Sequence, residues 1–178
     1  IETTLALTLA HDVDGALHIL DAIRYRDAQI DFLQRRHFPM AEWIPELIAL
    51  GLFTDITKNL GGSDVIIAHK RLSPEIWHKR RHAGEVQLPD DRIPSGDFSI
   101  PVWPLQQARA GAQTIPSGTL LNVVRVDFRS TPSSVSHQGW VLAKNGRLFM
   151  RHAADRKFHR VVDEPLHVFL RRMAAYRK

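Results

Sequence analysis

The sequence predicts an α+β fold in which N-terminal helices precede an antiparallel sheet and a C-terminal helix ends the chain. Helical periodicity dominates the first 50 or so residues, and strand-like alternation dominates from residue 119 onward. An Asn145-Gly146 dipeptide between two strand-like runs adds the strongest short-range signal for a β-hairpin. Because helices and strands are segregated along the chain, they do not form the alternating units of a parallel sheet.

The composition is that of a soluble globular protein, with 44% hydrophobic and 24% charged residues in 178. We expect one domain over residues 1–178 that is incomplete at its N-terminus, because Ile1 already reads as part of a helix. No apolar run is long enough for a membrane span. The net charge of +5 favours an anionic partner, such as nucleic acid, anionic lipid or a cell-wall polymer.

The N-terminal third reads as helices joined by polar turns. Residues 1–10 form the first helix, and Asp12 or Asp14 is expected to cap a second helix that runs to about Arg24. A short helix from Glu42 to Leu50 should end at Gly51. The apolar residues expected to point inward are Ala16, Leu17, Leu20 and Ile23 on the second helix, and Ile30, Phe32 and Leu33 in the connection after it.

The middle of the chain is less regular. Residues 65–68 read as a buried strand, and residues 77–82 form a basic run with one aromatic residue, either a nucleic-acid footprint or a solvated helix. Residues 84–118 are rich in Pro, Gly, Asp and Ser, which predicts a long loop or insertion that lines a binding cleft. Trp103 in this stretch is either a cleft aromatic or a packing anchor.

The C-terminal third reads as strands and one helix. We expect strands over residues 119–128 and 159–162, in addition to the hairpin. Asp163 is expected to cap the final helix, with Pro165 in its first turn. The apolar stripe of that helix is Leu166, Phe169, Leu170 and Met173.

The hairpin places two histidines on one face of the sheet. A two-residue turn at Asn145-Gly146 sets Lys144 opposite Arg147, which puts Gly139 opposite His152. His137 and His152 are then diagonal cross-strand neighbours, with Gly139 leaving the space between them open. Two imidazoles that can meet form an arrangement that general acid–base catalysis uses.

The hairpin, read as Ser136-His137-Gln138-Gly139, a Lys-Asn-Gly turn and Met150-Arg151-His152-Ala153, resembles the NlpC-type papain-fold cell-wall peptidases. More closely, the chain resembles the N-acetylmuramoyl-L-alanine amidase-like family of that fold. The further segments that carry this resemblance are Ile23–Asp27, Trp43–Ile44, Gly51–Thr57, Leu60–Gly62, Ile115–Gly118 and Leu121–Arg125.

The resemblance implies a peptidoglycan hydrolase that uses a cysteine, a histidine base and a second histidine. His137 would be the base and His152 the residue that orients it. The family's cysteine lies in an Asp-Cys-x-Thr-aromatic-Ile/Val-Glu run, and the match begins just after it, at Ile1-Glu2. The chain contains no cysteine, so the resemblance implies a nucleophile upstream of Ile1.

Peptidoglycan or a muropeptide is the expected substrate, and neither a cofactor nor a metal nor nucleic acid is expected. Arg24, Tyr25 and Arg26 would bind substrate carboxylates, unless the arginines form an ion pair with Asp27. Ser136 and Gln138 flank the base and would also contact substrate. The implied location is the bacterial cell envelope, either periplasmic or secreted.

Three alternatives remain open at this stage. The chain could be a non-catalytic peptide- or glycan-binding module of the same fold. It could be a nucleic-acid-binding protein that uses residues 77–82. It could also be a zinc amidase, which would need a third ligand near His137 and His152.

Overall fold

The computed structural model describes residues 1–80, 87–125, 134–154 and 159–175. The chain divides into two compact units, each assembled from three segments. The first unit comprises Ile1–Thr54, His69–Ile100 and Arg125–Ser134, and the second comprises Asp55–Ala68, Pro101–Val124 and Val135–Lys178. Within the described ranges, none of the helices has the length and apolar character that crossing a membrane requires.

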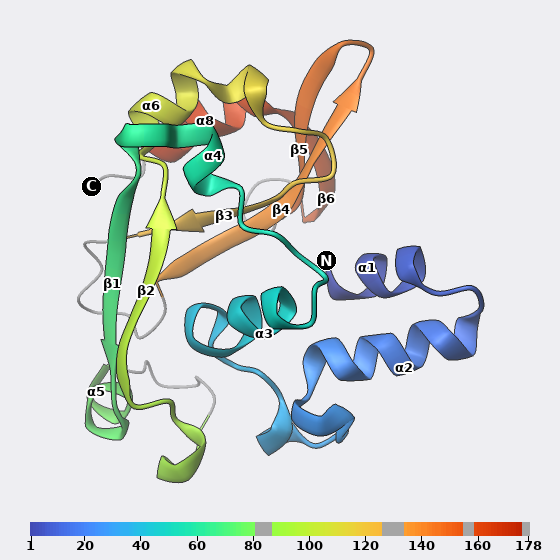
Figure 1. Cartoon of the computed structure of the whole chain (residues 1–178), viewed down its shortest axis with the longest axis vertical. Coiled ribbons are helices and arrows are strands. Elements are labelled where there is room, and N and C mark those ends of the chain that lie inside the picture. The colour runs from blue at the N-terminus through green and yellow to red at the C-terminus, as the bar shows by residue number, and fades with distance from the viewer. Residues whose placement is uncertain (81–86, 126–133, 155–158, 176–178) are drawn as a thin grey trace. The chain divides into compact units, whose positions relative to one another are not determined.

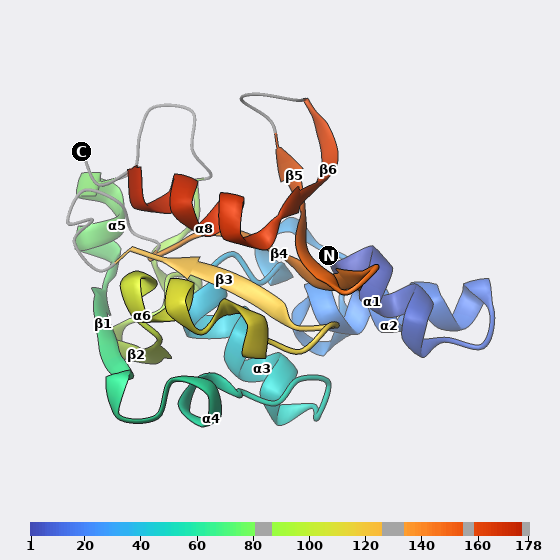
Figure 2. The same cartoon turned by 90° about the horizontal axis from the view of Figure 1, so that it is seen from above.

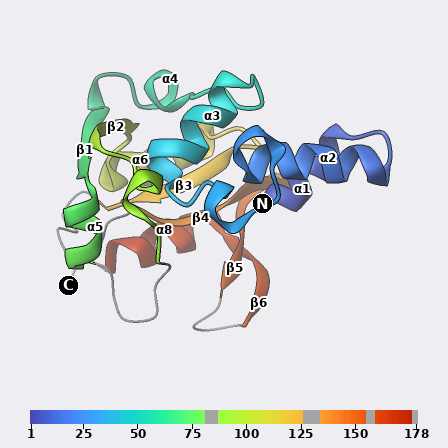
Figure 3. The same ribbon diagram turned by 90° about the horizontal axis from the view of Figure 1, so that it is seen from below.

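The first unit opens with two helices, α1 (Glu2–Leu9) and α2 (Val13–Arg24), which pack against each other as a helical hairpin (Figures 1 and 3). The predicted aspartate cap is present, because Oδ1 of Asp12 accepts a hydrogen bond from the backbone N–H of Gly15 at 2.7 Å. Ala16 and Ile23 are buried as expected, whereas Leu17 is exposed. The buried face of α2 is therefore narrower than the apolar stripe in its sequence.

The connection after α2 differs from the prediction. Ile30, Phe32 and Leu33 were expected to point inward, but they are 72%, 53% and 39% exposed. Short 3₁₀ turns at Arg26–Ala28 and Phe32–Gln34 form this connection, and their hydrogen bonds are local. A segment that satisfies its own backbone in this way needs no apolar anchor in the core.

A π-helical turn (Pro39–Trp43) leads into α3 (Ile44–Ala49), and Gly51 follows with φ of +70° as the expected C′ glycine. Further along, α5 (Pro74–Arg80) carries Trp77 into the core of the first unit. The ring of Trp77 meets Phe38 edge-on, with 5.0 Å between centroids. The buried cluster of this unit is Phe38, Leu72, Trp77, Leu88 and Ile93.

Two strands, β1 (Ile66–Leu72) and β2 (Gly96–Val102), form a two-stranded sheet of their own (Figure 1). The division between the two units falls within both strands. The prediction of a buried strand at residues 65–68 is wrong in part. Ala68 is buried, but Ile66 and Ile67 are nearly half exposed, since a two-stranded sheet buries only part of its side chains.

The second unit is built on a four-stranded antiparallel sheet with the order β3-β4-β5-β6. Its strands are β3 (Leu120–Val124), β4 (Val135–Lys144), β5 (Arg147–Ala154) and β6 (Arg160–Pro165). Helices among the described residues of this unit include α4 (Thr57–Gly61), α6 (Leu105–Ala110) and α8 (Leu166–Ala175). Residues 126–128 of the strand predicted over 119–128 lie outside the described residues.

The predicted hairpin and its register are confirmed. Asn145 and Gly146 have φ of +48° and +72°, as a type I′ turn requires. Lys144 pairs with Arg147, and Val141 pairs with Met150. The strand-to-strand geometry on which the histidine argument depends is therefore present.

The final helix, α8, lies along one face of this sheet (Figure 2). Its predicted stripe is buried at Leu166, Phe169 and Leu170. The core that α8 shares with the sheet contains Ala112, Ile115, Val141, Met150, Leu166, Phe169 and Leu170. Val141 and Met150 are fully buried in it, so this face of the hairpin carries the core of the unit.

The prediction that Asp163 caps the final helix is wrong. Asp163 lies within β6 opposite Arg151, and its carboxylate accepts hydrogen bonds from Nε and Nη2 of Arg151 at 2.7 and 2.8 Å. Lys144 also donates to this carboxylate. Because strand and N-cap positions share an extended backbone, the local sequence before Pro165 fits either state, and the basic partners on β4 and β5 decide between them.

Candidate functional site

The two hairpin histidines are in direct contact. His137 lies on β4 and His152 on β5, and Nε2 of His137 is 2.9 Å from Nδ1 of His152. The rings meet edge-on, with centroids 4.9 Å apart and an interplanar angle of 81°. His152 is buried and His137 is half-buried, so one imidazole is fixed inside the unit while the other reaches toward its surface.

Gly139 was expected to leave open space between the two histidines, and the structure shows a different role. A Cβ at this position would lie 2.5 Å from Cε of Met150, 2.6 Å from the carbonyl oxygen of Arg151 and 2.9 Å from Cβ of His152. The space beside Gly139 is therefore not open, because the neighbouring strand already fills it. Glycine is needed here for close approach of β5, which brings the two histidines within hydrogen-bonding distance.

Two residues that the sequence reading missed extend this contact. Nε2 of His152 is 3.2 Å from Oε2 of Glu164, which lies on β6. Arg172 on α8 donates to both oxygens of Glu164, from Nε at 3.1 Å and from Nη2 at 2.6 Å. His137, His152, Glu164 and Arg172 thus form one continuous hydrogen-bonded chain across three strands and a helix.

A phenyl ring packs against both imidazoles. Phe169 of α8 is fully buried, and its ring centroid is 5.2 Å from that of His152 and 6.0 Å from that of His137. A buried phenyl ring in contact with both imidazoles restricts their rotation. The guanidinium carbon of Arg172 lies over the same phenyl ring, 5.4 Å from its centroid. Helix α8 therefore contributes both the phenyl ring under the imidazoles and the arginine that ends the hydrogen-bonded chain.

The surroundings of His137 favour its neutral form. Burial lowers the pKa of His137 below its ordinary value, and the nearby charges of His152 and Arg172 lower it further, while Glu164 opposes them. At Glu164, burial raises the pKa, but the hydrogen bonds and charge of Arg172 and then of His152 outweigh it, so the pKa is lowered. A neutral imidazole can accept a proton, and the lowered pKa keeps His137 in this form at neutral pH.

The residues flanking His137 make contacts to β3. The hydroxyl of Ser136 donates to the carbonyl oxygen of Val123 at 3.2 Å, and the amide of Gln138 donates to Oδ1 of Asn122 at 2.6 Å. Both side chains therefore help to tie β4 to β3. Their predicted contacts to substrate stay a prediction.

Arg24, Tyr25 and Arg26 belong to the first unit. Nε of Arg24 donates to Glu2 at 2.8 Å, and Arg26 is paired with Glu42. The ion pair with Asp27 that we considered is therefore replaced by pairs with two glutamates. Tyr25 forms an isolated bridge with Arg35, and the predicted binding of substrate by these three residues stays a prediction.

The sequence did not decide whether Trp77 and Trp103 bind a ligand or pack inside the protein, and the structure shows both of them packed. Trp77 of the basic run is 8% exposed in the core of the first unit, which leaves no indole face for a base to stack on. Residues 81 and 82 of that run lie outside the described residues. Trp103 packs against Gly61 and Gly111, where an added Cβ would lie 2.9 and 2.3 Å from its indole ring, so it anchors the second unit.

In the described part of the chain, no three His, Cys, Asp or Glu side chains are grouped as a metal ion would require. The zinc alternative needs ligand atoms that converge on one point. His137 and His152 instead bond to each other, and the second nitrogen of His152 faces Glu164.

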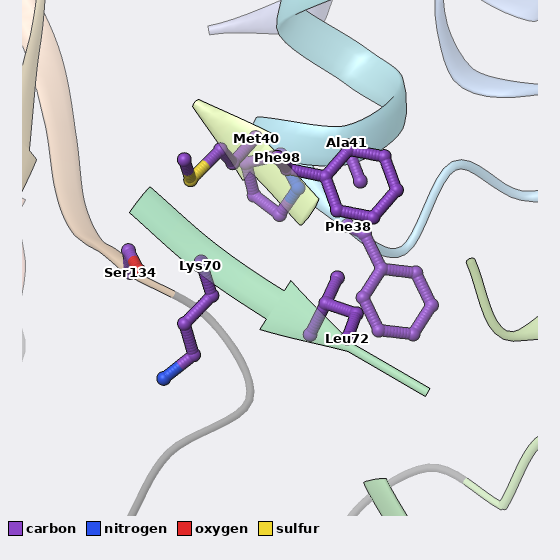
Figure 4. Close-up of a pocket in the computed structure, with 8 residues that line it drawn as sticks. Phe38, Met40, Ala41, Lys70, Leu72, Phe98 and Ser134 are labelled. Atoms are coloured by element: carbon purple, nitrogen blue, oxygen red, sulfur yellow. The ribbon is translucent and has the colours of Figure 1, made fainter. Parts of the chain in front are cut away.

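A small hollow lies in the first unit, with an empty volume of about 230 Å³ that includes space open to solvent (Figure 4). Its lining is apolar apart from Lys70 and Ser134 at one side. The other lining residues are Phe38, Pro39, Met40, Ala41, Leu72 and Phe98. The histidine chain lies in the second unit, and it supplies the acid–base groups that this hollow does not.

Comparisons with known proteins identify a family and a shared fold. A family model described as N-acetylmuramoyl-L-alanine amidase-like matches residues 1–175, and no curated protein matches the chain. A Legionella pneumophila protein of the DUF1460 family is 21% identical with a TM-score of 0.83, covering 99% of this chain and 70% of its own.

Two Bacteroides structures are also similar. A candidate xylanase from Bacteroides fragilis is 21% identical with a TM-score of 0.72, over 96% of this chain and 78% of its own. An N-acetylmuramoyl-L-alanine amidase from Bacteroides uniformis is 21% identical with a TM-score of 0.71, over 96% of this chain and 76% of its own. At this level of identity, these likenesses establish the shared fold.

Proposed function

The chain belongs to the N-acetylmuramoyl-L-alanine amidase-like family, and we propose on this basis that it is a peptidoglycan hydrolase that cleaves an amide bond. The bond is either the one between N-acetylmuramic acid and L-alanine or one within the stem peptide. The observation that carries this proposal is the 2.9 Å contact between His137 and His152 on adjacent strands. Such a pair supplies a base and the group that orients it.

The proposed mechanism uses a cysteine that lies outside residues 1–178, upstream of Ile1, in a papain-like fold of the NlpC type. His137 takes the thiol proton, and the thiolate attacks the carbonyl carbon of the scissile amide. The backbone N–H of the cysteine stabilises the oxyanion, and His137 then returns the proton to the leaving amine. Water, deprotonated by His137, hydrolyses the thioester and releases the carboxylic acid and the free thiol.

His152 holds the ring of His137 in this mechanism. Its burial and its contact with Phe169 leave it little freedom to rotate, so the imidazole of His137 is presented in one orientation. We further propose that Ser136 and Gln138 contact substrate next to the base. Arg24, Tyr25 and Arg26 would reach substrate carboxylates only by exchange of their present glutamate and backbone partners.

Peptidoglycan in the cell envelope, periplasmic or outside the cell, is the substrate that this proposal implies. The test uses the complete reading frame that contains these residues, incubated with purified peptidoglycan and muropeptides, with products identified by mass spectrometry. His137→Ala should reduce the rate by about 10²- to 10⁴-fold, the usual contribution of a general base. His167→Ala, which removes an exposed histidine of α8, is the matched control and should retain the rate.

A second function is a non-catalytic module that binds peptide or glycan through the same fold. Residues 1–178 contain no cysteine, and they are compatible with this module as well as with the hydrolase. The residue that stands at the family's cysteine position in the complete reading frame separates the two. Ser, Ala or Gly at that position, together with binding of muropeptides without release of products, would replace the hydrolase proposal.

A further inference from the structure

The histidine pair continues beyond the two residues that the mechanism uses. Glu164 meets His152 on the side opposite His137, and its side chain is 12% exposed. The carboxylate is gripped by Arg172 through two hydrogen bonds, which fixes its orientation. A largely buried carboxylate at the end of a pair of imidazoles constrains where the protons of both imidazoles can be.

When both histidines are neutral, only one assignment of donors and acceptors satisfies the contacts among these groups. An ionised carboxylate only accepts, so Nε2 of His152 carries its hydrogen and donates to Glu164. Nδ1 of His152 is then bare and accepts, which requires Nε2 of His137 to donate to it. His137 consequently has its lone pair at Nδ1, the ring nitrogen that faces away from the pair.

We propose that Glu164 is a positioning residue: it sets the direction of the hydrogen bonds so that the lone pair of His137 stands at Nδ1, and Arg172 holds Glu164 in place. This inference rests on the proposed function, in which Nδ1 of His137 takes the proton of the nucleophile. No proton passes through Glu164 during the reaction. Its carboxylate selects the tautomer of His152, and His152 selects that of His137.

The charged groups around the pair agree with this assignment. Glu164 approaches from β6 and Arg172 from α8, while the neighbouring positions of β3 on this face are the apolar Leu121 and Val123. The ionised state of Glu164 is supported by the lowered pKa that Arg172 and His152 together impose against burial. Protonation of His152 would instead make both its nitrogens donors and move the lone pair of His137 to Nε2, so the arrangement holds only while His152 is neutral.

The test is a histidine-resolved ¹H–¹⁵N NMR titration of residues 1–178, which needs neither nucleophile nor substrate. At the alkaline plateau, His152 and His137 should each show a single tautomer protonated at Nε2, with a slowly exchanging Nε2–H signal for His152. Glu164→Ala should lose that slow signal and release a second tautomer. Glu164→Gln, of the same size but uncharged, should shift the titration of His137 to lower pH, because a negative charge that favours the imidazolium is gone.

Asp163→Asn is the matched control. It changes the neighbouring carboxylate of the same strand, which pairs with Arg151 and Lys144 and not with the histidines, so both readouts should stay as in the wild type. If Glu164→Ala does not fold, the titration of Glu164→Gln decides. Wild-type His152 protonated at Nδ1, or unchanged signals in Glu164→Ala, or an unmoved titration in Glu164→Gln would overturn the proposal.

The two proposals fail separately. If the NMR signals show the predicted tautomers but the complete protein releases no product from peptidoglycan, the hydrolase proposal is refuted. The role of Glu164 in orienting the histidine pair would then remain. An active enzyme whose tautomers are indifferent to Glu164 would do the reverse.

Discussion

Replacement of Gly139 by alanine tests how closely the hairpin must approach to bring its histidines together. Gly139 lies on β4 beside the pair, and its backbone is extended, so alanine introduces no unfavourable φ there. The added methyl group is the only change. Its neighbours would be Met150, Arg151 and His152 on β5.

The size of the effect follows from these contacts. The new Cβ would fall short of an ordinary 3.4 Å contact by about 0.9 Å at Cε of Met150 and about 0.8 Å at the carbonyl oxygen of Arg151. The Met150 side chain can move, but the carbonyl belongs to the strand, so β5 must shift. Overpacking of this kind costs about 1–3 kcal/mol, and the backbone contact places Gly139→Ala in the upper half of that range.

A shift of β5 also acts on the histidine pair. The Nε2–Nδ1 distance is 2.9 Å, so a displacement of half an ångström or more, on the order of the overlap, takes it to the limit of a hydrogen bond. The loss of that bond would add about 1 kcal/mol. Gly139→Ala should therefore destabilise the chain by about 3–4 kcal/mol and release the fixed tautomers of both histidines.

Urea denaturation measures the first effect, and the NMR experiment on the histidines measures the second. Ala143→Ser, at an exposed position of the same strand, should stay within about 0.5 kcal/mol of the wild type. A loss of less than about 0.5 kcal/mol in Gly139→Ala, with the histidine signals unchanged, would refute the argument that glycine is required for close approach.

Four further outcomes are expected. Gly111→Ala should cost about 1–3 kcal/mol in thermal unfolding, because its Cβ would lie 2.3 Å from the indole of Trp103. Phe169→Ala should cost about 3–5 kcal/mol and broaden the signals of both histidines that rest on the ring. Hydrogen bonds from Arg151 and then Lys144 lower the pKa of Asp163. Its contribution to the free energy of unfolding is therefore present above the unfolded pKa of about 3.9 and is lost as pH falls toward the folded value. Asp163→Asn should make the free energy of unfolding, measured with urea, depend less on pH in this acid range. In the complete protein, the acid limb of kcat/KM should lie below the ordinary histidine value of about 6.5, because burial lowers the pKa of His137 and the base form persists to lower pH.

The sequence was most informative where a structural signal is local. Asn145-Gly146 requires positive φ at two successive residues, and that requirement fixes both the turn and the cross-strand register. That register makes His137 and His152 cross-strand neighbours, and the close approach of β5 at Gly139 brings their rings into contact. The cap at Asp12 and the buried stripe of α8 are likewise set within one or two helical turns.

The sequence was least informative where a side chain depends on a distant partner. Asp163 precedes Pro165, a pattern typical of a helix start, but its carboxylate is bound by basic residues on β4 and β5. Glu164 was missed for the same reason, because its approach to His152 depends on the pairing of β6 with β5. The exposed Ile30 and Phe32 show the converse, since apolar character alone does not specify burial.

Two acidic residues near the end of β6 show how one register serves both faces of the sheet. Successive side chains of a strand point to opposite faces, so Asp163 meets Arg151 and Lys144 on one face while Glu164 meets His152 on the other. A slip of one residue would exchange them and place the shorter carboxylate beneath His152. Surface ion pairs contribute only about 0.2–1 kcal/mol each, too little to hold the strand by themselves. The stronger constraint is Leu166, which follows β6 directly and is 1% exposed, because the same slip would pull it out of the core. Burial of α8 therefore fixes the position of Glu164, and the orientation of the histidines depends on the packing of a helix as much as on the strands that carry them.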